Sequence, residues 1–220
     1  MKRILVIIAS VFMAMAVNAQ SVTTTWPYLY SEFTQGQIYQ TTGAQEPTLM
    51  NVHLAQGHVH YVDKQGNIRE VNARNFVRAV ISGSEFIFRD GMLMKVLSSG
   101  DNGLVCARYL VDMASLNETG GAYGVSSSTL STQKLSSVQS NSVNMNHMEL
   151  MSRKNEGQKV EIKTTYFLVH DGKCIEASKK AVTEAVPSDK QAALKTFLKN
   201  NKINWKAVSD LESVLEFLSK

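Results

Sequence analysis

The stretch "EFIFRDGMLMKVL", residues 85–97, contains the clearest structural signal in the chain. Two runs rich in aromatic and aliphatic residues flank the dipeptide Asp90-Gly91. Asp-Gly is a preferred sequence for the two-residue turn that joins adjacent antiparallel strands, because both turn residues must adopt a positive φ. The stretch therefore predicts a β-hairpin, and the rest of the fold can be built outward from it.

Similar strand-like runs continue on both sides of this hairpin. They are separated by short segments rich in Gly, Asp, Asn and Ser, and they lie at residues 36–41, 48–55, 58–63, 68–71, 75–81 and 104–113. The short and regular spacing is typical of an antiparallel meander and leaves no room for the crossover helices of a parallel sheet. We expect a curled sheet or an open barrel.

The C-terminal part, residues 161–220, changes character. A second hairpin is predicted around Asp171-Gly172, and helices follow it. Ser188 with Gln191, and Ser209 with Glu212, match the capping-box pattern that begins a helix. Each helix has an apolar stripe that should pack against the sheet, formed by Ala193, Leu194, Phe197, Leu198, Leu211, Val214, Leu215 and Leu218. The predicted class is α+β: an antiparallel β-meander, then a β-hairpin and C-terminal helices.

The first residues predict export. Lys2 and Arg3 precede an almost wholly apolar run at residues 4–17, and small residues stand where a signal peptidase reads. We expect a signal peptide at 1–19, cleaved between Ala19 and Gln20, and a periplasmic or secreted protein. No later stretch is apolar enough for a membrane span.

The mature chain then divides into three parts. Residues 20–114 form the antiparallel β-rich domain, and residues 161–220 form the β-hairpin and helical tail. Between them, residues 115–160 are rich in Ser, Asn, Gln and Gly without a sustained period. Such a composition buries too little apolar surface to offset its ordering entropy, so it predicts a polar low-complexity loop or linker.

The charge balance gives little reason to expect an anionic partner. The formal net charge of the whole chain is +4, and two of the positive charges, Lys2 and Arg3, belong to the signal peptide, which leaves +2. Lysines gather in the tail, but acidic residues lie among them, as on a solvated helix face. We expect no nucleic-acid partner.

The chain has two cysteines, Cys106 and Cys174. Outside the cytosol, two thiols within reach of each other usually oxidise, so a disulfide between the β-rich part and the tail is one interpretation. Two separate thiols, one of them buried in a strand, are the other. The chain contains no C-x-x-C motif, so neither a thioredoxin-like activity nor a cysteine zinc site is indicated.

Three of the five histidines lie in "NVHLAQGHVHYV", residues 51–62. With a two-residue turn at Gln56-Gly57, His53 would pair with His60, and His58 would share their face. Three imidazoles with an open fourth position suit zinc or copper. No nearby carboxylate stands out as a partner. We favour the other interpretation, a solvated sheet face, because the opposite face is apolar and should form the core.

A resemblance is carried by the tail. The stretches "YFLVHDGKCIEASKKAV" (166–182) and "SDKQAALKTFLKNNKINWKAVSDLESVLEFL" (188–218) resemble the ends of small exported bacterial envelope proteins of unassigned function. Those proteins combine an N-terminal β-meander with a lysine-rich helical tail. The shared motifs are structural, so the resemblance implies a fold and an exported location but no activity.

Motifs for catalysis are missing from the sequence. There is no G-x-S-x-G and no H-E-x-x-H, and "GGAYG" at 120–124 lacks the context of a phosphate-binding loop. We therefore predict no catalytic residues. The preferred hypothesis is a non-enzymatic exported protein that binds a protein or a glycan of the cell envelope. The alternative is a periplasmic metal-binding protein that uses the histidine hairpin.

Overall fold

The computed structural model describes residues 23–24, 28–112, 148 and 160–220. The predicted signal peptide and its cleavage site lie outside the described residues. So does nearly all of the predicted polar segment at 115–160.

The described residues contain one antiparallel sheet of twelve strands. In chain order these strands are β1 (Thr23–Thr24), β2 (Thr34–Gln40), β3 (Gly43–Ala44), β4 (Thr48–His53), β5 (His58–Val62), β6 (Ile68–Glu70), β7 (Phe76–Ile81), β8 (Ser84–Arg89), β9 (Met92–Gly100), β10 (Gly103–Val111), β11 (Val160–His170) and β12 (Lys173–Glu176). Ten of them follow the order β1-β11-β10-β9-β8-β7-β2-β4-β5-β6, while β12 pairs with β11 and β3 pairs with β2. The predicted antiparallel architecture is confirmed.

The two Asp-Gly hairpins form as predicted. In β8–β9, Arg89 pairs with Met92, and Asp90 and Gly91 have φ values of 50° and 74°. In β11–β12, His170 pairs with Lys173 around an equivalent turn. Two positive φ values in succession are the geometry for which Asp-Gly is suited.

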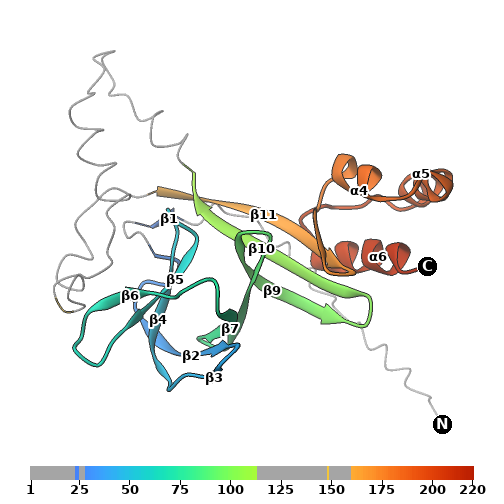
Figure 1. Ribbon diagram of the computed structural model, residues 1–220. Helices are drawn as coiled ribbons and strands as arrows, with labels where there is room; N and C mark the ends of the chain where they lie inside the picture. Colours follow the sequence, from blue (N-terminus) through green and yellow to red (C-terminus); the bar gives the residue numbers. More distant parts are fainter. Residues whose placement is uncertain (1–22, 25–27, 113–147, 149–159) are drawn as a thin grey trace, which may run out of the picture.

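The sheet curls strongly without closing into a continuous ladder (Figure 1). Its path runs from β1 at one end to β6 at the other. The curl brings the β4–β5 turn against the end of β10, where the Val111 amide donates to the Leu54 carbonyl oxygen at 3.2 Å. The predicted curled sheet is therefore confirmed.

Two main apolar clusters lie along this sheet. One fills the curled part and consists of Ile38, Met50, Val52, Val59, Val71, Ala79, Ile81, Phe86 and Leu93. The other lies where the helices cover the long strands β9–β11, away from β2–β6 (Figure 1). Because β9 contributes Leu93 to the first cluster and packs Leu97 against the second, the sheet and the helical tail share a structural element.

The helical tail comprises α4 (Lys179–Ala185), the short 3₁₀ helix η1 (Ser188–Lys190), α5 (Gln191–Asn200) and α6 (Val208–Leu218). The predicted apolar stripes pack against the sheet: Leu194, Leu211 and Val214 are buried in one cluster with Val105 and Leu168. Ala193, predicted on the same stripe, is exposed. None of the helices in the described ranges is long and apolar enough to cross a membrane.

Both predicted capping boxes are wrong. Ser188 begins η1, and the residue that precedes α5 makes no side-chain capping bond. Helix α6 begins before Ser209, and Glu212 accepts a hydrogen bond from Ser98 of β9 instead of capping the helix. The side-chain cap is found earlier, at Ser178, whose hydroxyl accepts from the Ala181 amide at 3.2 Å. In α6, the contact of Glu212 with the sheet replaces the predicted cap.

Candidate functional site: the histidine face and a neighbouring groove

The β4–β5 turn is longer than predicted and changes the register of the histidines. The turn contains four residues, and His53 pairs with His58 while His60 pairs with Asn51. The predicted pairing of His53 with His60 is wrong. The amide of Gly57 closes the turn by donating to the His53 carbonyl oxygen at 2.7 Å. Since the register moved by an even number of residues, all three histidines still share one face.

Most of that face is buried, so the prediction of a solvated face is wrong for His53 and His60, and only His58 is partly exposed. His53, His60 and Asn51 have 0% exposed surface. They lie beneath residues 28–33, which we call the N-terminal strap. Its Tyr28 and Phe33 are themselves buried and form an apolar cluster with Ile68 of β6. The sequence analysis missed this cover because the strap has no strand pattern of its own.

Asn51 fastens the strap to β4. Its Nδ2 donates to the carbonyl oxygens of Tyr30 at 2.8 Å and Glu32 at 3.0 Å, and its Oδ1 accepts from the Tyr30 amide at 3.0 Å. The Leu29 amide adds a backbone bond to Val52 at 2.9 Å. One buried amide side chain thus satisfies backbone groups that a ladder would otherwise pair.

The strap also contacts the histidine rings directly. The hydroxyl of Tyr28 lies 2.8 Å from Nδ1 of His60, and the Tyr28 ring meets the His53 and His60 rings edge-on. The two imidazoles stack with centroids 4.9 Å apart and an interplanar angle of 26°. The Gln56 amide donates to Nδ1 of His53 at 3.3 Å. Each of these two rings therefore has a neighbour at its Nδ1 atom.

Glu70 of β6 is a further member of the histidine face, and the sequence alone did not indicate it. It pairs with His60 across the strands. Its Oε1 lies 2.8 Å from Nδ1 of His58, and its Oε2 lies 4.0 Å from Nε2 of His60. The side chains of His58 and Glu70 are about a third exposed. Period-2 alternation in β6 was the signal that could have placed Glu70 on the histidine face.

The electrostatic state of the cluster follows from its burial. Burial, together with the smaller effects of the neighbouring His53 and His58, lowers the pKa of His60 to about 3. A positive charge at this position would be removed from water beside two other imidazoles. His60 is therefore neutral at ordinary pH, and its Nδ1 can accept the hydroxyl proton of Tyr28.

The zinc or copper site that the sequence offered as an alternative is not preformed in the described residues. Across residues 28–112 and 160–220 and the few others described, no three His, Cys, Asp or Glu side chains are grouped so that they could hold a metal ion. The structure brings His53, His58 and His60 onto one face, as the sequence indicated. It stacks two of the rings on each other and fills their surroundings with the strap.

Of the two interpretations of the cysteine pair, the structure agrees with two separate thiols and not with a disulfide. Cys106 and Cys174 are free thiols. They lie on β10 and β12, with β11 between them: Cys106 pairs with Phe167, and Cys174 pairs with Val169. Two strand spacings amount to about 10 Å, beyond the roughly 7 Å over which Cα atoms can be bridged. The sequence predicted this strand as part of the Asp171-Gly172 hairpin but could not show that it pairs with β10.

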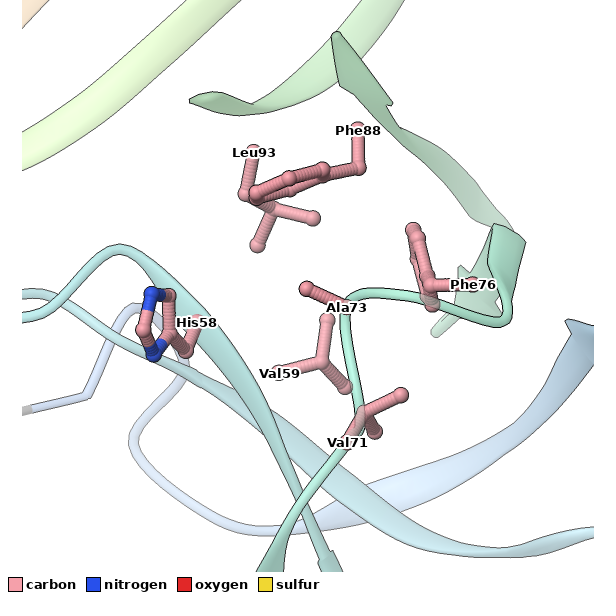
Figure 2. Close-up of a pocket in the computed structure, with 7 residues that line it drawn as sticks. All are labelled: His58, Val59, Val71, Ala73, Phe76, Phe88 and Leu93. Carbon is pink, nitrogen blue, oxygen red and sulfur yellow. The ribbon is translucent and has the colours of Figure 1, made fainter. Parts of the chain in front are cut away.

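A small apolar pocket lies beside His58, at the edge of the core (Figure 2). It is lined by His58, Val59, Val71, Ala73, Phe76, Phe88 and Leu93, and its volume is about 240 Å³ including the open mouth. In Figure 2 the aromatic rings of Phe76 and Phe88 stand on the far side from His58. The enclosed volume is only about 20 Å³, far below the range of about 300–1,000 Å³ that is usual for small-molecule sites.

A larger polar groove lies at the other end of the β4–β5 hairpin. One wall is the segment 45–48, and the other is the end of β5 with the β5–β6 turn at 61–65. Its volume is about 930 Å³ including open solvent. The lining residues are Gln45, Glu46, Pro47, Thr48, Tyr61, Val62, Asp63, Lys64 and Gln65.

No protein family, no curated protein and no solved structure matches this chain.

Proposed function

We propose that this chain is a non-enzymatic exported envelope protein that binds a glycan through the polar groove beside the β5–β6 turn. The observation that carries the proposal is the lining of that groove, which combines an aromatic side chain, Tyr61, with amide, carboxylate and ammonium groups. Sugars present hydroxyls that need such hydrogen-bonding partners and C–H faces that pack on an aromatic ring. The signal peptide expected at 1–19 supports export.

The turn that forms one wall is held rigid. Asp63 accepts hydrogen bonds from the amides of Gln65 at 2.9 Å and Asn67 at 2.8 Å, and its Oδ2 lies 2.9 Å from Nε of Arg69. The hydroxyl of Thr48 donates to the Val62 carbonyl oxygen at 2.6 Å and joins the two walls. A preformed wall lowers the entropy lost on binding.

The rim of the groove contains an ion pair that a ligand can displace. Lys64 Nζ and Glu46 Oε2 lie 3.3 Å apart across it, and their side chains are 86% and 83% exposed. An ion pair this exposed contributes little to stability, so a ligand can replace it at low cost. The rigid wall and the displaceable ion pair together support a site for a polar, uncharged ligand.

Glycan-array screening of the purified mature protein tests this proposal. We expect selective retention of envelope glycans, with affinity reduced at least tenfold, about 1.4 kcal/mol, by the double substitution Lys64→Ala and Gln65→Ala. Lys195→Ala on α5 is the matched control, because Lys195 is an exposed lysine that does not line the groove. Retention of no glycan, or equal binding by the double variant, would contradict the proposal. Capture of a protein partner from the native envelope, with equal affinity for the wild type and the double variant, would also contradict the glycan proposal.

A further inference from the structure

The N-terminal chain contacts two separate parts of the curled sheet. Thr24 pairs with Val160 of β11, and Tyr28 forms an isolated bridge with His53 of β4. β11 and β4 are not neighbours in the sheet. The N-terminal chain therefore connects two regions that the strand ladder leaves apart, and Figure 1 shows β1 close to this junction.

The strap rests on groups whose contacts depend on protonation. With His60 neutral, the Tyr28 hydroxyl can donate to its Nδ1 at 2.8 Å. Protonated His60 carries hydrogens on both ring nitrogens, so this hydroxyl could no longer donate. The new charge would also be fully buried and stacked 4.9 Å from the His53 ring.

The groups that face His60 offer limited compensation. His53 projects from β4 and His58 lies two residues away on β5, while Tyr28 approaches from the strap. Glu70 of β6 is the acidic group beside it, at 4.0 Å, and its other oxygen is engaged with His58. Burial accordingly lowers the pKa of His60 to about 3.

From this arrangement we infer that the strap is an acid-released closure: protonation of His60 detaches residues 28–33 from β4 and uncovers the histidine face. The sign follows from linkage. Once the strap is detached and His60 meets water, its pKa returns toward the ordinary value of about 6.5. The open state then binds more protons, so acidification below pH 6.5 favours opening by up to about tenfold per pH unit, until the closed state is also protonated near pH 3.

Amide hydrogen exchange of the mature protein between pH 7.5 and pH 4.5, corrected for intrinsic rates, tests the inference. The probes are the amides of Leu29 and Tyr30 in the strap, and that of Leu211 in α6 reports global unfolding. We expect the strap to lose its protection at a pH at which α6 is still protected. Loss of both at the same pH would overturn the inference, since it would mean unfolding of the whole molecule.

The matched variant is His60→Asn, which keeps an acceptor near the position of Nδ1 and removes the titrating ring. Strap protection in this variant should be independent of pH over the same range. A strap that opens with acid equally well in the variant would overturn the inference. Tyr28→Phe, which removes only the hydroxyl, should open the strap more at neutral pH. If His60→Asn does not fold, the comparison of strap and α6 in the wild type decides alone.

Discussion

At the scale of single residues, Asn51 and His60 show how a polar side chain becomes structural. Both lie on β strands at positions that alternation assigns to the non-core face, and both are fully buried by the strap. Buried polar groups persist in proteins when their hydrogen bonds are satisfied. Asn51 satisfies this condition with the strap backbone, and His60 satisfies it in part with the hydroxyl of Tyr28.

Replacing Asn51 should therefore be costly. Asn51→Ala leaves three partly buried backbone groups of the strap without this partner, at a cost of about 1 kcal/mol each, so we expect a loss of about 3 kcal/mol in the free energy of unfolding. Urea denaturation measures it. The control Asn75→Ala changes an exposed asparagine and should cost no more than about 0.5 kcal/mol. Equal effects of the two substitutions would show that the strap is not held by Asn51.

The thiols give a second prediction at this scale. Burial raises the pKa of Cys106 to about 12 and that of Cys174 to about 11, so few thiolates exist at pH 8. We expect slow alkylation of Cys174 in the folded protein and none of Cys106. Both thiols should react at once after denaturation without a reductant, as mass spectrometry can show. A denatured chain with no free thiol would restore the disulfide that the structure lacks.

At the scale of elements, turns and register decide how the sheet closes. The two Asp-Gly turns specify their hairpins locally, whereas the four-residue β4–β5 turn has no such signature. The start of β10 differs again, because Gly103 lies close to the backbone of the paired strand β11. A Cβ atom on Gly103 would lie 2.2 Å from the Val169 carbonyl oxygen, and its φ is 132°.

Substitution of this glycine tests the close approach. Gly103→Ala should reduce the free energy of unfolding by about 3 kcal/mol or more, because the strand backbones must separate and the backbone is strained. Gly172→Ala is the control: its φ is +75° but its Cβ would meet nothing within 4 Å, so only about 1–2 kcal/mol should be lost. Thermal denaturation of both variants measures the difference. Similar losses would mean that strain alone, without the contact, sets the cost.

At the scale of the whole molecule, β9–β11 join the sheet to the helical tail. Leu93 of β9 belongs to the apolar cluster of the curled sheet, and Val105 and Leu168 belong to the cluster beneath the helices. Unfolding one end removes strands that the other end needs. The described parts of the chain should therefore behave as one cooperative unit.

Denaturation of a single variant can verify this cooperativity. Leu211→Ala in α6 creates a cavity in the helical cluster and should cost about 3 kcal/mol. Far-ultraviolet circular dichroism and labelling of the Cys106 thiol, which lies on the opposite side of β10 from Val105, should shift together. The exposed Val77→Ala should cost less than about 0.5 kcal/mol. Two separate transitions would show that sheet and helices unfold independently.

The sequence by itself determined the elements that local physics specifies. The Asp-Gly turns, the alternating strands and the apolar stripes of α5 and α6 predicted an antiparallel sheet with C-terminal helices, because each signal involves neighbours along the chain. Tertiary structure alone decided what meets across long distances. It placed β11 between the cysteines and brought Glu212 into contact with Ser98. It also covered the histidines with the strap and placed Glu70 beside them. Alternation assigns a side chain to a face of a strand, but only the folded chain decides whether water or another segment covers that face.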